Sequence, residues 1–253
     1  MSKIWFPALA GLLLGCGLAA LVGTPTIRAK DEPAATVPTT ALAEADIAFL
    51  KKGLSKKPKD NELNTLKATA MMLALYAEGD LAGPDAAKAA GRRDQALLIA
   101  AALKNKDYVA AKAAVEGLAP AKEGDPKKVV KLHEQHGFDL NELMSQFALG
   151  RSGGRHIEAD LKTQSAKVTD VKLAAELGGR VATIGRYTAV LPPADAVGPK
   201  KKKWDDLSAE MVKLGTAASE AAKGDAPDKV ALAKKLAAIN LNCKNCHDVF
   251  RNN

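Results

Sequence analysis

Residues 203–223 (KWDDLSAEMVKLGTAASEAAK) and 227–250 (PDKVALAKKLAAINLNCKNCHDVF) decide the fold class. In both stretches apolar residues recur at alternating steps of three and four, the spacing of one face of an amphipathic α-helix. Gly224 and Asp225 separate the stretches, and Pro227 suits the first turn of a helix. Two helices joined by a tight turn are therefore predicted. Their apolar positions are Trp204, Leu207, Met211, Leu214, Ala218 and Ala221 in the first, and Leu232, Leu236, Ile239, Cys243, Cys246 and Phe250 in the second.

The same helical period precedes these two stretches. We expect further helices near residues 157–168 and 170–190. Short connections between the four helices favour antiparallel neighbours in an up-and-down arrangement. Residues 156–253 are therefore predicted to form an antiparallel four-helix bundle.

Residues 41–121 show the same organisation in a weaker form. Their order of apolar spacings resembles that of the C-terminal part, and residues 107–110 (DYVA) align with residues 228–231 (DKVA). We therefore expect a degenerate tandem repeat, with a second helical bundle that residues 122–155 link to the first. The helical stretches of this second bundle are expected near 42–55, 61–78, 86–104 and 107–119.

The composition fits an all-α fold and excludes other classes. Aromatic residues make up 4% of the 253 residues, which argues against a β-sandwich or barrel. The apolar share of 47% is too high for a disordered chain. Three cysteines are too few for a disulfide framework in a chain of this length.

The N-terminus has the pattern of an export signal over residues 1–29. Lys3 supplies a positive end, an apolar stretch runs from Ile4 to Val22, and residues 27–29 (IRA) form a tolerable signal-peptidase site. Two alternatives stay open: retention of the apolar stretch as a membrane anchor, and a lipobox that ends at Cys16. All three place the mature chain outside the cytoplasm, in the periplasm or otherwise exported. Residues 30–40 are then a flexible leader.

The chemistry of the chain is concentrated in residues 243–247 (CKNCH). C-x-x-C-H is typical of c-type haem attachment. Residues three and four apart share one face of a helix, so Cys243, Cys246 and His247 are expected to point the same way. Two thiols can form thioethers with the haem vinyl groups, and the imidazole can ligate the iron. One covalent haem c is the expected cofactor.

The two cysteines allow three other interpretations. A thioredoxin-like pair follows a strand near the start of an α/β domain, whereas this pair ends a helical chain. A zinc site needs a second Cys/His pair, and none lies nearby. A disulfide within one helical turn would constrain little.

The C-terminal part resembles the cytochrome c′ family, the class II c-type cytochromes. The resemblance is good over residues 199–253 and weaker over 157–198. It implies that Cys243 and Cys246 attach haem and that His247 is the proximal iron ligand. It also implies that Arg251 lies beside the proximal haem face. The matching features are Trp204, Lys213-Leu214, Ala221-Ala222, Gly224-Asp225 and residues 242–251 (NCKNCHDVFR).

The second axial position is the point at which the chain departs from the family. Family members place a leucine or methionine of their first helix there. The corresponding distance before Cys243 leads to Leu143 and Met144, so Met144 is a candidate ligand, with apolar packing as the alternative. Residues 150–154 (GRSGG) would break a helix that continued from Met144.

The histidines outside the motif are further candidates. His156 follows the glycine-rich loop and could reach the iron, with a solvent-facing position as the alternative. His133 and His136 have charged neighbours and are expected to be exposed.

These features favour an exported monohaem c-type cytochrome that transfers electrons. A five-coordinate haem protein that binds nitric oxide or carbon monoxide is one alternative, and a structural or interaction scaffold is another. Enzymatic activity is not expected, because no distal acid–base groups can be assigned. Residues 41–121 contain no Cys or His and are expected to fold without haem.

The charge pattern suggests the kind of partner. The formal net charge is +8, and Lys200–Lys203 form either a solvated helix start or a docking patch for acidic redox partners or an anionic membrane. Nucleic acid is not an expected partner, because the chain has few aromatics and no recognisable binding motif. The N-terminus offers a route to membrane association, and the sequence leaves the oligomeric state open.

Overall fold

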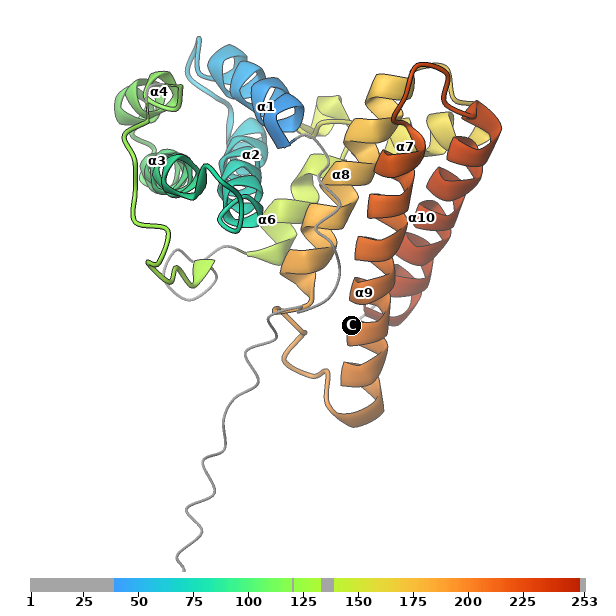
Figure 1. The fold of residues 1–253 in the computed structure, drawn as a ribbon. Helices are drawn as coiled ribbons and strands as arrows, with labels where there is room; N and C mark the ends of the chain where they lie inside the picture. The colour runs from blue at the N-terminus through green and yellow to red at the C-terminus, as the bar shows by residue number, and fades with distance from the viewer. Residues whose placement is uncertain (1–38, 120, 133–138, 251–253) are drawn as a thin grey trace, which may run out of the picture. The chain divides into compact units, whose positions relative to one another are not determined.

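The computed structural model describes residues 39–119, 121–132 and 139–250 (Figure 1). All regular secondary structure in these ranges is helical, which confirms the all-α fold class. The α-helices are α1 (Thr39–Gly53), α2 (Asp60–Gly79), α3 (Ala86–Lys104), α4 (Tyr108–Glu116), α6 (Leu140–Met144), α7 (Ile157–Ala166), α8 (Val171–Thr188), α9 (Gly198–Ala221) and α10 (Lys229–Phe250). Two short 3₁₀ helices are η1 (Ser145–Phe147) and η2 (Gly150–Ser152).

Aspartates stabilise the starts of several helices. The Asp107 carboxylate accepts a hydrogen bond from the backbone N–H of Ala110, and Asp170 accepts one from Leu173, both at 3.0 Å. Asp228 accepts two such bonds at the start of α10, at 2.8 and 3.0 Å. Each bond satisfies a backbone donor that has no partner within the helix. The helix starts predicted near these residues therefore have a local physical cause.

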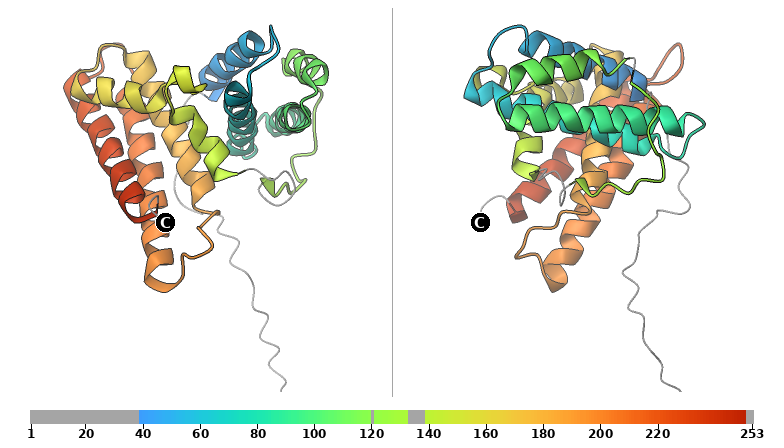
Figure 2. Two further views of the ribbon diagram at one scale, coloured as in Figure 1. Left: turned by 180° about the vertical axis from the view of Figure 1, so that it is seen from behind. Right: turned by 90° about the vertical axis from the view of Figure 1, so that its left-hand side faces the viewer.

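Helices α7 to α10 pack together in the C-terminal part. α8 lies along α9, and α10 packs against both α9 and α7. The left-hand view of Figure 2 shows α8, α9 and α10 side by side from behind. α9 begins at Gly198, five residues before the predicted start at residue 203, because Pro199 is accepted in its first turn. The indole N–H of Trp204 donates to the Thr188 carbonyl at 2.8 Å and joins α9 to the end of α8.

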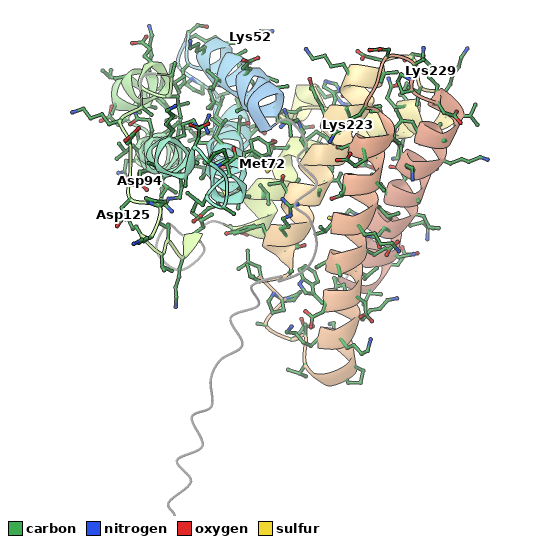
Figure 3. The ribbon with its side chains drawn as sticks, viewed as in Figure 1. Lys52, Met72, Asp94, Asp125, Lys223 and Lys229 are labelled. Carbon is green, nitrogen blue, oxygen red and sulfur yellow. The ribbon has the colours of Figure 1, made fainter. Side chains whose placement is uncertain are left out.

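The N-terminal helices form their own packed layer. α2 packs against α1 and α3, and α3 packs against α4. Met71 and Met72 of α2 are almost completely buried, and Met72 is labelled in Figure 3. This burial agrees with a role as core residues. That these helices are a degenerate copy of the C-terminal bundle stays a prediction.

A buried ionic network joins the N-terminal helices to α8. The Arg180 guanidinium donates to both carboxylate oxygens of Asp46, at 2.6 and 3.0 Å, and to the Tyr76 hydroxyl at 3.1 Å. Arg155 forms a second ion pair with Asp46. Asp46 is fully buried and Arg180 is nearly so. Burial and the charge of Asp46 raise the pKa of Tyr76, so the phenol remains protonated. The network therefore connects α1, α2 and α8 with Arg155, which lies two residues before the start of α7.

The described parts of the segment expected as a linker, residues 122–132 and 139–155, pack onto the fold. α6 lies against α2, and Leu143 and Gln146 are fully buried. The buried Arg93 of α3 donates to the carbonyl of Lys128 at 3.1 Å, which fixes the first part of the segment. The segment therefore contributes to the core as well as connecting the two halves.

Several predictions fall outside the described residues. These are the export signal over 1–29 with Cys16, the leader as far as residue 38, and the residues His133, His136 and Arg251. Thr39 and Thr40 belong to α1, so the expected leader over 30–40 is two residues too long at its end. Across the described ranges, no helix has the length and apolarity needed to span a membrane.

Candidate functional site

The C-x-x-C-H motif lies in the last turns of α10, just after a point where this helix is anchored. Asn242 is buried, and its side-chain amide donates to the Leu207 carbonyl of α9 at 3.1 Å. Asn240 donates to the Leu161 carbonyl and the Ser165 hydroxyl of α7, at 3.3 and 2.9 Å. These bonds fix the rotation of α10 about its own axis, and with it the face on which the motif lies.

Cys243 and Cys246 are partly buried free thiols. Burial, together with the nearby charges of Cys246 and Glu158, raises the pKa of Cys243 to about 11. Burial also raises the pKa of Cys246. Redox-active cysteine pairs have a lowered thiol pKa, often at a helix N-terminus, whereas these thiols lie near a helix C-terminus and stay protonated. The thioredoxin-like alternative is therefore disfavoured on physical grounds.

The donor set fits a c-type haem. Cys243 and Cys246 are one helical turn apart, His247 follows four residues after Cys243, and these spacings share one helical face. Cys243 also packs against the hydrophobic core. The face of α10 that carries the motif therefore borders an apolar environment at Cys243. His247 is exposed and lies in the last turn. Within the described ranges, no group of three or more His, Cys, Asp or Glu side chains could hold a metal ion.

Aromatic side chains close the end of the bundle beside the motif. The rings of Trp204 and Phe250 meet edge to face, with their centroids 5.0 Å apart. The Lys200 ammonium lies 5.7 Å from the centroid of the Phe250 ring. Phe250 therefore ties the last turn of α10 to the start of α9.

The lysine run at the start of α9 is largely neutralised by the chain itself. Lys200 pairs with Asp195, Lys201 with Asp205 at 2.6 Å, and Lys202 with Asp206 at 2.7 Å. Pairs four residues apart on a helix are common and individually weak. The local positive charge is therefore much smaller than four consecutive lysines suggest, and this favours the solvated helix start over a docking patch.

Met144 and His156, the two candidates for the second axial ligand, lie in different parts of the fold. Met144 ends α6, which packs against α2, and its side chain is half-buried. His156 immediately precedes α7, which packs against α10. Glu158 of α7 lies close enough to affect Cys243. Nothing in the sequence near Glu158 singles it out, because Cys243 lies 85 residues away.

The raised thiol pKa makes a testable prediction for the haem-free full chain. At pH 8 a thiol with a pKa of about 11 is ionised to about one part in a thousand, so iodoacetamide should modify Cys243 slowly. The rate should keep rising above pH 9, where an ordinary cysteine levels off. Trypsin cleavage after Lys244 places the two cysteines on separate peptides for mass spectrometry. A rate for the folded protein that levels off near pH 8.5, as in the urea-unfolded control, would contradict the prediction.

An all-helical chain with C-x-x-C-H on its last helix has the arrangement of a helical c-type haem protein. Comparison with curated proteins supports this class: the chain is 34% identical over 90 residues to the cytochrome c′ of Rhodopseudomonas palustris. The match covers 36% of this chain, and it spans 57% of that relative, little more than half its length. No family model matches the chain. No solved structure matches it either.

Proposed function

We propose that the chain is an exported, periplasmic, monohaem c-type cytochrome that transfers electrons between redox partner proteins. The observation that carries the proposal is the C-x-x-C-H motif on one face of α10, with Cys243 against the core. The partial similarity to a cytochrome c′ supports it. The proposal includes no enzymatic step.

The residues of α10 have separate roles in this proposal. Cys243 and Cys246 would hold the haem through two thioethers, each formed by addition of one thiol S–H across one vinyl group. His247 offers a neutral ring nitrogen as the proximal ligand. When bound, the haem iron supplies a one-electron ferric/ferrous couple. The hydrogen bonds of Asn240 and Asn242 hold the part of α10 from which these groups project.

The test is maturation of the full chain in a host that attaches c-type haem. We expect the mature protein to carry the mass of one haem, to retain it in acid–acetone, and to show a c-type reduced spectrum. The matched control is the variant Cys243→Ser/Cys246→Ser, which should lose covalent haem and keep its helical content. A colourless protein with free or disulfide-bonded thiols would refute the proposal, and a second haem would refute a haem-free N-terminal half.

The gas-binding and scaffold alternatives give different results in the same preparation. A reduced high-spin spectrum that carbon monoxide shifts would favour the gas-binding protein. A haem-free double-serine variant that still bound its partner would favour the scaffold. A low-spin spectrum unaffected by carbon monoxide would favour electron transfer.

A further inference from the structure

The loop before α7 is held in one backbone conformation. Arg155 donates its backbone N–H to the Gln146 carbonyl, and His156 donates to the Ala148 carbonyl, both at 2.9 Å. Gly153 has a φ of 85°, and a Cβ there would lie 2.1 Å from the carbonyl oxygen of Asn61 in α2. The loop therefore packs against neighbouring backbone, and the position of His156 is fixed by its main chain.

Arg155 fixes the loop a second time, through its side chain. Its guanidinium pairs with the buried Asp46 of α1 and lies 4.5 Å from the centroid of the Phe49 ring. Asp46 is in turn held by Arg180 of α8. The residue that precedes His156 is thus tied into the ionic network that joins the N-terminal helices to α8.

His156 itself has two unusual features. Its backbone is left-handed, with φ 62° and ψ 12°, a region that few residues other than glycine adopt and that is over-represented at functional sites. Its Nε2 accepts a hydrogen bond from the Gly150 backbone N–H at 2.9 Å. A nitrogen that accepts carries a lone pair, so this ring can ligate a metal. The side chain is exposed, and the left-handed backbone is held by the main-chain hydrogen bonds of the loop.

The position of His156 relates it to the attachment cysteines. α7 packs against α10, and Asn240 binds Leu161 and Ser165 of α7 directly. Nearer its start, α7 carries Glu158, whose carboxylate acts on the Cys243 thiol. Two residues of helix correspond to about 3 Å along the axis, so the backbone of His156 is close to that of Glu158.

We propose that His156 is the second axial ligand of the haem iron, opposite His247. The inference rests on the covalent haem proposed above. Ligation breaks one hydrogen bond, from the Gly150 N–H to Nε2, and forms one nitrogen–iron bond; the freed N–H is exposed and bonds water. No electron is transferred and no proton leaves, because the nitrogen already carries a lone pair. An iron with two imidazole ligands is six-coordinate, which suits electron transfer and excludes gases until one ligand leaves.

The test is the spin state of the matured full chain. We expect low-spin optical and electron paramagnetic resonance spectra for the wild type. In the variant His156→Gly both spectra should become high-spin, and carbon monoxide should bind at the vacant axial position. Glycine adopts a φ near 62° without strain, so this variant should fold at least as well as the wild type. Added imidazole should restore the low-spin spectrum by filling the vacant position.

Met144→Leu is the matched control, because it removes the other candidate ligand and retains apolar volume. It should leave the low-spin spectrum unchanged. A high-spin wild type, a low-spin His156→Gly, or loss of the low-spin state in Met144→Leu would each overturn the assignment of His156. All three results can be obtained on protein that carries covalent haem. The two variant results leave the proposed electron transfer intact, whereas a high-spin wild type that carbon monoxide shifts would also favour the gas-binding alternative. Failure to attach haem refutes the proposed function instead, and with it this assignment.

Discussion

We expect Asp46→Ala to lower the free energy of unfolding by about 3–5 kcal/mol, because it leaves two buried guanidinium groups without their carboxylate. Asp46 is fully buried, and the side chains of Arg180 and Arg155 are only 5% and 13% exposed. The hydrogen-bond partner left to Arg180 is the neutral Tyr76 hydroxyl, and Glu176 acts on it only as a nearby charge. Urea titration monitored by circular dichroism measures the effect.

The matched control is Asp60→Ala. Asp60 pairs with Lys106 at 3.0 Å, but its side chain is 89% exposed. A surface pair of this kind contributes about 0–1 kcal/mol. The two variants remove the same group and differ in burial, so equal losses of stability would refute the importance of the buried network. A double-mutant cycle with Arg180→Met measures the direct coupling between Asp46 and Arg180.

The helices could be predicted from the sequence because their causes are local. Apolar residues spaced by three and four mark the buried face of each helix, and the glycine-rich loop before α7 interrupts the helical period. Gly224 adopts a φ of 90° where the sequence placed a turn. The resulting helices differ from the predicted ranges mainly at their ends, where capping residues and the last hydrogen bonds decide the boundary.

The ionic network could not be predicted, because its members are distant in sequence. Arg155 and Arg180 lie 109 and 134 residues from Asp46. An arginine in an amphipathic helix is normally exposed, and nothing near Arg180 in the sequence marks it as buried. Asp46 likewise resembles a surface residue of α1. Only the packing of α1 on α8 brings these charges together.

The candidate site was predicted in part. The spacing of Cys243, Cys246 and His247 is contained within five residues, so local geometry was enough to place them on one face. For the second axial ligand, counting back along the chain from Cys243 leads to Met144. Such counting assumes a continuous first helix, whereas η1, η2 and the glycine-rich loop interrupt it here. The interruption brings His156, and not Met144, to the start of the helix that packs on α10.

The second large effect on stability is expected where α8 and α9 cross, because the backbones of the two helices are in contact there. A Cβ on Gly215 would lie 2.5 Å from the backbone nitrogen of Ala182 and 2.6 Å from the carbonyl oxygen of Gly178. Backbone atoms cannot move aside as a flexible side chain does, so the helices must separate. Overpacking of this kind typically lowers stability by about 1–3 kcal/mol. We expect Gly215→Ala to lose stability in this range and Gly215→Leu to lose more.

The direction of the stability change in Gly215→Ala distinguishes a backbone clash from the ordinary preference of helices for alanine over glycine. Alanine is favoured over glycine in a helix by up to about 1 kcal/mol, so Gly215→Ala would stabilise the protein if the site had room. Gly79 at the end of α2 provides that case: a Cβ there would meet only Arg186, at 3.9 Å. Gly79→Ala should therefore raise the urea midpoint slightly, while Gly215→Ala lowers it. If both variants raised the midpoint, the close contact between α8 and α9 would be refuted, and with it the rigid support that these helices give to α10.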